Sequence, residues 1–176
     1  DIAAMMRAAE RELGPVDIVV NNAVVRNFAA IDELPPERWE LALAVNLSAA
    51  FHTTRLALPG MKRRDFGRIV NMASAYGILG AAGRVDYVTT KTGLLGLTRA
   101  TAVECADYDI TCNALCPGTV DTPAIVEKIE GQAAAEGIGY DEAVRRYLQE
   151  RQPGGRFIAA ENVAALAVFL CGPAGR

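Results

Sequence analysis

The feature that most constrains this chain is the alternation of short apolar runs with long helical segments. The order is a helix up to residue 13, a strand at 16–20, a helix at 37–58, a strand at 68–72, a helix at 85–107, a strand at 110–115 and a helix at 161–170. Strands that alternate with long helices predict an α/β fold with a parallel sheet and right-handed crossovers. Because the strand runs are apolar throughout, we expect both faces of the sheet to be covered.

Glycine and proline mark the predicted ends of these helices. Gly14 and Pro15 close the first helix, Pro36 opens the second, and Pro59-Gly60 is expected to terminate it. The first helix has no preceding strand, so the sequence leaves it nothing obvious to pack on. Between Ala75 and Gly83 the chain is rich in glycine, which we interpret as a flexible active-site loop rather than a phosphate cradle.

Composition excludes several classes of protein. With 176 residues, 51% of them hydrophobic and a net charge of −3, the chain is long and apolar enough for one folded domain and shows no strongly basic face for nucleic acid. The apolar stretch at 163–171 is far shorter than the roughly 20 residues of a membrane helix. No charged and apolar leader opens the chain. We expect a cytoplasmic protein that binds neither nucleic acid nor membrane.

The cysteines and the single histidine argue against metal chemistry. Four cysteines stand at 105, 112, 116 and 171, without a C-x-x-C pair, and His52 is the one histidine. A zinc site built from cysteine and histidine is therefore nearly excluded. We expect buried, reduced thiols and no metal site.

Tyr87 and Lys91 carry the clearest chemical signal. They stand four residues apart at the start of a predicted helix, so both side chains project from one face. A tyrosine hydroxyl titrates near pH ~10, and a neighbouring ammonium favours the phenolate, which suits proton exchange with an alcohol or a carbonyl. Ser74 follows a strand, where it can donate a hydrogen bond to a carbonyl oxygen. Singly, the pair also fits a surface contact and the serine a helix cap.

In this order, the motifs resemble those of the short-chain dehydrogenase/reductase family. The resemblance runs through nearly the whole chain and rests on Asn21-Asn22-Ala23, Asn46, the Ser74, Tyr87 and Lys91 set, and the segment from Pro117 to Pro123. It implies that Tyr87 is the acid and base, that Lys91 also holds the nicotinamide ribose, and that Ser74 orients the carbonyl. It further implies that Asn46 holds a water that relays protons through Lys91.

The same resemblance implies a nicotinamide cofactor, NAD, with NADP as the alternative. The implied cofactor-binding residues are Asn22, Ala23, Tyr87, Lys91, Pro117, Gly118, Val120 and Thr122. It also implies a Rossmann-type, doubly wound sheet that lacks the family's N-terminal strands and its last strand. Residues 1–176 would then form a single partial domain in which 16–20 is an exposed edge strand. The helices at 37–58 and 85–107 would make the contacts of a homotetramer.

Within the family, the chain is most similar to the D-3-hydroxybutyrate dehydrogenases. The similarity lies in 46–52, 58–62, 66–71 and the insert at 119–152. That insert is helical and charged, as expected for a lid over the substrate, and an ordinary solvated pair of helices is the alternative.

Five positions depart from the pattern, Val24 from that of the family and the others from that of this branch. Val24 occupies a position where the family has glycine. Arg26, Tyr76, Arg84 and Thr119 occupy positions where those dehydrogenases have glutamine, histidine, lysine and tryptophan, respectively. The two arginines suit a carboxylate, so we expect an anionic keto- or hydroxy-acid substrate. Both arginines also fit solvated loop positions. The expected substrate-binding residues are Arg26, Ser74, Tyr76, Arg84 and Thr119.

The leading hypothesis is an oxidoreductase that transfers a hydride between the cofactor and a small 3-hydroxy acid such as 3-hydroxybutyrate. One alternative is a related reductase of a 3-oxoacyl thioester or a sugar-derived ketone. The other is a truncated, catalytically silent relative that acts as a binding partner.

Overall fold

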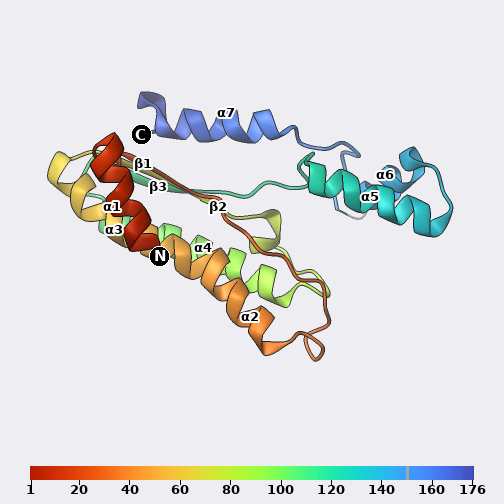
Figure 1. The fold of residues 1–176 in the computed structure, drawn as a ribbon. Helices are drawn as coiled ribbons and strands as arrows, with labels where there is room; N and C mark the ends of the chain where they lie inside the picture. Colours follow the sequence, from red (N-terminus) through yellow and green to blue (C-terminus); the bar gives the residue numbers. More distant parts are fainter. Residues whose placement is uncertain (150) are drawn as a thin grey trace. The chain divides into compact units, whose positions relative to one another are not determined.

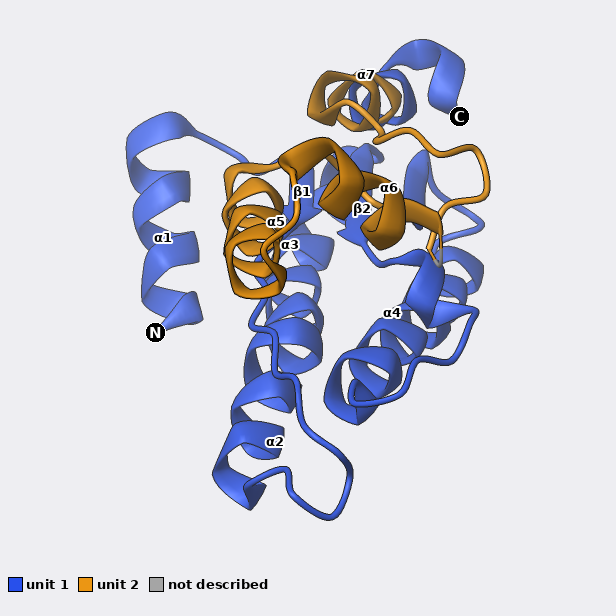
Figure 2. Ribbon diagram, turned by 90° about the vertical axis from the view of Figure 1, so that its right-hand side faces the viewer, with its two compact units in different colours: residues 1–116, 167–176 blue, residues 117–166 orange. Residues whose placement is uncertain are grey.

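The computed structural model describes residues 1–149 and 151–176. The chain divides into two compact units, one of residues 1–116 with 167–176 and the other of residues 117–166 (Figure 2). Each unit is described by itself below. The prediction of one domain with an insert at 119–152 stays a prediction, although the second unit encloses that segment.

The first unit contains a parallel sheet, seen nearly edge-on in Figure 1. Its three strands have the order β1-β2-β3. The strands are β1 (Ile18–Asn21), β2 (Gly67–Met72) and β3 (Ile110–Leu115), and Val19, Ile69 and Cys112 are in register across them. β1 pairs only with β2 among the described strands, so it is the edge strand, as expected. The predicted parallel α/β fold is confirmed, with β1 displaced by one to two residues from the predicted run.

Three helices pack on one face of this sheet: α1 (Ile2–Leu13), α3 (Ala49–Arg64) and α4 (Val85–Glu104) (Figure 1). Met6 of α1 lies in a buried cluster with Val19, Met61 and Ile69. The expectation that the first helix has nothing to pack on is therefore wrong, because α1 packs along α3. The end of α1 is as predicted, since the Gly14 amide caps it at a φ of 92°.

The predicted helix end at Pro59 is also wrong. The segment folds as α2 (Pro36–Leu43), a π-helical turn at Ala44–Ser48, and α3, which continues through Pro59 to Arg64. A proline inside a helix costs one hydrogen bond. The next turn offsets that cost because Met61 is fully buried in the core cluster. The helix ends at Asp65, which adopts a left-handed φ of 51°.

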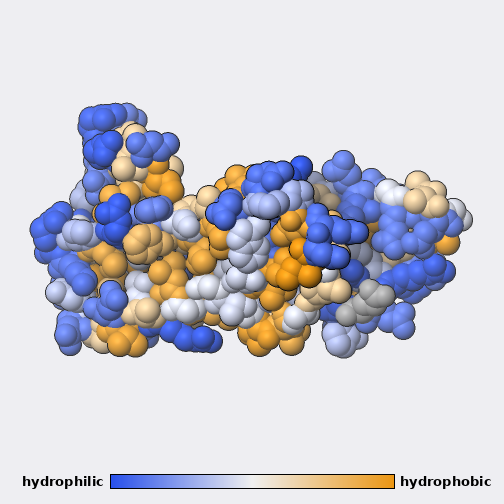
Figure 3. All heavy atoms as spheres, turned by 90° about the horizontal axis from the view of Figure 1, so that it is seen from below, coloured by the Kyte–Doolittle hydropathy of each residue, from blue (hydrophilic) through white to orange (hydrophobic). Residues whose placement is uncertain are grey.

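By length and composition alone, Pro36–Arg64 would be able to cross a membrane. The segment contacts α1, α4, β1 and β2, and 28% of its apolar window is buried. Figure 3 shows apolar atoms gathered on this helical side of the molecule, and Leu41, Phe51 and Val103 are among the exposed apolar residues of α2, α3 and α4.

The expectation of a fully covered sheet is not met at β1. Val19 faces the helices and is buried, whereas Ile18 and Val20 remain 48% and 50% exposed. Neighbouring side chains on a strand point to opposite faces, so the helices that cover Val19 cannot cover these two. β2 is buried along nearly its whole length.

The second unit is mostly helical, as predicted for 119–152. It contains α5 (Pro123–Glu136) and α6 (Tyr140–Gln149), which pack together around Ile129 and Leu148. A parallel bridge joins Val120 to Ile158. The last helix, α7 (Ala160–Cys171), begins in this unit and ends in the first.

One close approach positions the loop after β2. A single 3₁₀ turn at Ala75–Gly77 packs against α4, and a Cβ added at Gly77 would lie 2.9 Å from the Lys91 carbonyl oxygen. Thr92 Oγ1 also donates a hydrogen bond to the Gly77 carbonyl at 3.1 Å. Only glycine therefore lets this turn lie so close to the helix.

We expect Gly77→Ala to push the turn away from α4 and to lower the free energy of unfolding by about 1–3 kcal/mol. Urea denaturation followed by circular dichroism measures the loss. Gly80→Ala is the matched control, because a Cβ at Gly80 would meet nothing within 4 Å. Equal stabilities of the two variants would contradict the close approach.

Candidate active site

The candidate site lies where β2 ends and α4 begins. Lys91 is 3% exposed, and its Nζ donates a hydrogen bond of 2.5 Å to the carbonyl oxygen of Met72, the last residue of β2. Ser74 follows two residues later, is buried, and accepts a hydrogen bond of 3.2 Å from the Tyr76 amide. The Lys91 ammonium thus connects α4 by a hydrogen bond to the end of β2, which Ser74 follows.

Three side chains surround the ring of Tyr87, which is itself buried in the first turn of α4. The Arg84 guanidinium carbon lies 4.4 Å from the ring centroid and Lys91 Nζ lies 5.6 Å from it. Tyr76 meets the ring edge-on at 6.4 Å between centroids. The structure therefore brings these four predicted residues together.

Asn46 lies in the π-helical turn and is buried. Its Oδ1 accepts from the Val25 amide at 2.8 Å, and its Nδ2 donates to the Val25 carbonyl at 3.0 Å and to Thr90 Oγ1 at 3.4 Å. Thr90 stands on α4 between Tyr87 and Lys91. The side chain of Asn46 thus joins the loop after β1 to α4, and its polar atoms are already engaged.

The site carries a concentration of positive charge. Burial lowers the pKa of Lys91 to about 8, and the positive charge of Arg26 acts in the same direction. Burial also lowers the pKa of Arg84, which the charges of Tyr87 and Asp86 oppose. The Nε of Arg84 is buried without a hydrogen-bond partner among the described residues. The arrangement favours an anion.

Sequence reasoning missed the polar contacts beside Arg84. Asp86 is 1% exposed, and its Oδ2 accepts a hydrogen bond of 2.7 Å from Asn27 Nδ2. Arg38 Nη1 donates to Asn27 Oδ1 at 3.5 Å. Residues 27 and 86 are far apart in the sequence, and an aspartate in the first turn of a helix has an ordinary explanation as a favourable charge there. No local pattern would have found the pair.

Five predicted site residues belong to the second unit: Pro117, Gly118, Thr119, Val120 and Thr122. Within that unit, the Thr119 amide donates to Gln152 Oε1 at 2.8 Å, and Thr122 precedes the first turn of α5. Their predicted contacts with cofactor or substrate stay predictions.

Asn22 and Ala23 follow the edge strand and are exposed. They lie at the carboxyl end of the sheet, the usual place for a ligand in an open α/β fold. An ammonium has three donors, and Met72 is the one hydrogen-bond acceptor of Lys91 in the described part of the chain. The remaining donors fit the hydroxyl groups of a ribose, so these residues suit the nicotinamide end of a dinucleotide.

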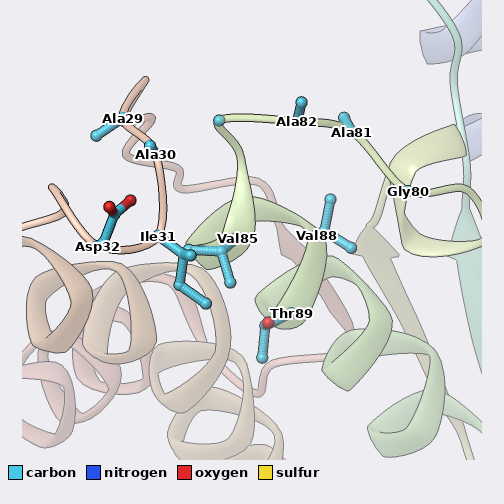
Figure 4. Close-up of a pocket in the computed structure, with 11 residues that line it drawn as sticks. Ala29, Ala30, Ile31, Asp32, Gly80, Ala81, Ala82, Val85, Val88 and Thr89 are labelled. Atoms are coloured by element: carbon cyan, nitrogen blue, oxygen red, sulfur yellow. The ribbon is translucent and has the colours of Figure 1, made fainter.

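A pocket of about 430 Å³ lies beside the first turns of α4 (Figure 4). Two loops, 29–32 and 80–83, line it together with Val85, Val88 and Thr89. Asp32 is its one charged lining residue, and no predicted catalytic residue lines it. The pocket is thus a mainly apolar neighbour of the site.

The thiols are free, as predicted. Cys105 and Cys112 are buried, whereas Cys116 and Cys171 are partly exposed, so the expectation of burial holds for two of the four. Burial raises the pKa of Cys112 to about 12, which makes it a poor nucleophile. Among the described residues, no three His, Cys, Asp or Glu side chains are grouped to hold a metal.

A parallel α/β sheet whose carboxyl end carries a buried tyrosine and lysine is an arrangement suited to the class of nucleotide-dependent oxidoreductases. Comparison with known proteins gives the family. The family model described as short chain dehydrogenase matches residues 1–133. The chain is 48% identical over its full length to D-beta-hydroxybutyrate dehydrogenase of Cupriavidus necator and covers 68% of that protein.

Two further similarities extend the comparison. Acetoacetyl-CoA reductase of Rhizobium meliloti is 40% identical over 164 residues, which are 92% of this chain and 62% of that protein. The crystal structure of an F189W actinorhodin polyketide ketoreductase with NADPH matches with a TM-score of 0.88 at 36% identity, covering 98% of this chain and 66% of that one. The chain belongs to the short-chain dehydrogenase family, whose members are NAD(P)-dependent oxidoreductases, and spans about two thirds of the length of these relatives.

The buried ammonium of Lys91 predicts a pH-dependent stability difference. The pKa of Lys91 falls on folding, so the folded state binds fewer protons than the unfolded state between pH about 8 and about 10.5. The free energy of unfolding of the wild type should therefore rise through this window relative to Lys91→Met. Urea denaturation without cofactor, at pH 7 and pH 10, measures the difference. If the difference in free energy of unfolding between the wild type and Lys91→Met were the same at pH 7 and pH 10, the burial of a charged lysine would be contradicted.

Proposed function

We propose that this protein oxidises a small 3-hydroxy acid, with 3-hydroxybutyrate as the substrate, to the 3-keto acid, and catalyses the reverse reduction. The observation that carries the proposal is the Tyr87–Lys91 pair, buried at the end of β2 with Arg84 against the tyrosine ring. The similarity to D-beta-hydroxybutyrate dehydrogenase over the full chain supports the choice of acid.

In the proposed mechanism, Tyr87 exchanges the proton with the substrate oxygen. As a phenolate it accepts the proton of the alcohol, and in the reverse direction its hydroxyl donates one to the carbonyl oxygen. The Lys91 ammonium stabilises the phenolate electrostatically, since burial leaves little water between them. Ser74 donates a hydrogen bond that orients the same oxygen and stabilises negative charge on it.

The cofactor, NAD with NADP as the alternative, accepts or supplies the hydride when it is bound. Lys91 would hold its ribose with the donors that Met72 leaves free, and Asn22 and Ala23 would lie beside it. Pro117, Gly118, Val120 and Thr122 are proposed to hold its nicotinamide end. Asn46 is proposed to position the site, because its side chain holds Val25 and Thr90 in place. Its expected role in holding a water that relays protons through Lys91 stays a prediction.

Arg26 and Arg84 are proposed to bind the carboxylate of the substrate. The charge of Arg26 acts on both Lys91 and Arg84, and the Arg84 guanidinium lies against the Tyr87 ring. The buried Nε of Arg84 has no acceptor among the described residues. An unsatisfied buried donor costs about 1–3 kcal/mol, which an incoming carboxylate would recover. Tyr76 and Thr119 complete the proposed substrate-binding set, with 119–152 as the lid.

The acetoacetyl-CoA reductase similarity favours one second candidate, the reduction of a 3-oxoacyl thioester. A 3-oxoacyl thioester has an uncharged thioester where the 3-keto acid has its carboxylate, one methylene away from the reacting carbonyl. It would therefore leave Arg26 and Arg84 without a carboxylate to bind. The acid is therefore the better match to this site. We also propose a homotetramer in the cytoplasm, whose subunits meet through the apolar residues exposed on α2, α3 and α4.

We expect Tyr87→Phe to lower kcat for D-3-hydroxybutyrate oxidation about 10²- to 10⁴-fold, because the variant cannot exchange the proton. Absorbance of the reduced nicotinamide at saturating substrate measures the rate. Tyr108→Phe, at a partly exposed tyrosine after α4, is the matched control and should keep wild-type activity. An active Tyr87→Phe enzyme would contradict the mechanism, and an inactive wild type would contradict the proposed function.

Substrate charge tests the role of Arg84. We expect Arg84→Ala to raise the KM for D-3-hydroxybutyrate about 10- to 100-fold, as the loss of a charge-assisted contact would. The KM for the methyl ester of the same acid should stay within a factor of about three. Arg99→Ala, an exposed arginine of α4, is the control. An unchanged KM for the acid would remove Arg84 from the carboxylate site.

A further inference from the structure

Phe28 stands over the cation that faces the catalytic tyrosine, and neither the sequence analysis nor the proposed mechanism gives it a role. The guanidinium carbon of Arg84 lies 4.2 Å from the centroid of the Phe28 ring and 4.4 Å from that of Tyr87. We call these three side chains the aromatic clamp. A guanidinium stacks on aromatic rings through its flat face, which leaves its N–H edges available for a carboxylate.

Two hydrogen bonds bracket Phe28 and attach it to the segment that carries Arg84. On one side, Asn27 Nδ2 donates to the buried Asp86 carboxylate at 2.7 Å. On the other side, the Ala29 amide donates to the Gly83 carbonyl at 3.2 Å. The residues before and after Phe28 are thus both held to residues within two positions of Arg84. These contacts restrain the chain on both sides of Phe28, whose ring is 60% exposed.

The clamp leaves one donor of Arg84 without a partner. Arg84 Nε is buried, and the described residues supply no acceptor for it. A buried donor without an acceptor is unfavourable unless a ligand completes it. The lowered pKa of Arg84 follows from the same burial and agrees with a site that awaits an anion.

We infer that Phe28 is a positioning and specificity-determining residue, whose ring holds the Arg84 guanidinium against Tyr87 so that its free edge receives the substrate carboxylate. The inference rests on the proposed function for the identity of that carboxylate. Because a flexible arginine loses rotamer entropy when it binds, a ring that holds it beforehand increases affinity for the acid. A neutral analogue gains nothing from this arrangement.

The test compares the isolated protein, as its own cell makes it, with Phe28→Leu, Phe28→Tyr and Phe28→Trp. Isothermal titration with acetoacetate in the presence of NAD⁺ measures carboxylate binding without turnover. We expect Phe28→Leu to raise the Kd about tenfold, as the loss of one cation–π contact would, and both aromatic variants to restore it to within about threefold. Phe169→Leu, an exposed phenylalanine on α7, is the control and should bind as the wild type does.

Steady-state kinetics distinguish this role from a merely structural one, because only the proposed role changes the KM for the acid without changing the KM for the ester. Phe28→Leu should raise the KM for D-3-hydroxybutyrate about tenfold, with little change in kcat and none in the KM for its methyl ester. An equal rise in KM for the acid and for its methyl ester would mean that Phe28 only shapes the site and does not act on the carboxylate. That result would overturn the inference. An unchanged Kd in Phe28→Leu, or a wild type that does not bind acetoacetate, would overturn it as well.

The binding titration and the kinetic measurement together separate this inference from the proposed function. A wild type that binds acetoacetate but does not oxidise D-3-hydroxybutyrate would refute the proposed substrate. In that case a weaker Kd in Phe28→Leu, restored by the aromatic variants, would still support the clamp as the carboxylate site.

Discussion

The candidate site depends on the burial of one ammonium group against one carbonyl oxygen. Lys91 gives up most of its contact with water, and its Nζ donates a hydrogen bond to the carbonyl at the end of β2. Burying a charge is expensive, so α4 must be held firmly on the sheet. Close packing of α4 provides this hold. The helix contacts β3, the turn at Gly77 lies against the Lys91 backbone, and the Leu47 side chain packs on Gly93, where a Cβ would come within 2.8 Å of it.

The same packing explains why the charges of the site gather at one end of the sheet. Parallel strands place their carboxyl ends at one edge, so the loops after β1 and β2 meet the start of α4 there. Arg26 comes from the first loop, while Arg84, Tyr87 and Lys91 come from α4 and its approach. Asp86 is the acidic residue among them, and it is already hydrogen-bonded to Asn27. The site is therefore arranged to attract an anion.

Much of the fold was predictable because it follows from local patterns. The three strands and the helix that carries Tyr87 and Lys91 lie close to their predicted bounds, and the segment predicted to be helical at 119–152 contains α5 and α6. The errors lie where tertiary packing outweighs a local signal. Pro59 is a helix breaker, yet the burial of Met61 carries α3 one turn further. Ile18 and Val20 are apolar, yet their exposure depends on which face of β1 the helices cover.

The sequence by itself determined the residue types of the chemistry and the spacing of Tyr87 and Lys91, since four residues make one turn of a helix. It also determined the order of strands and helices, because hydrophobic periodicity is a local property. Only the tertiary structure decided that Phe28 lies over Arg84, that Asn27 reaches Asp86, and that Asn46 holds Val25. These pairs are 56, 59 and 21 residues apart, and contacts at such separations depend on how the sheet and α4 pack rather than on any local pattern.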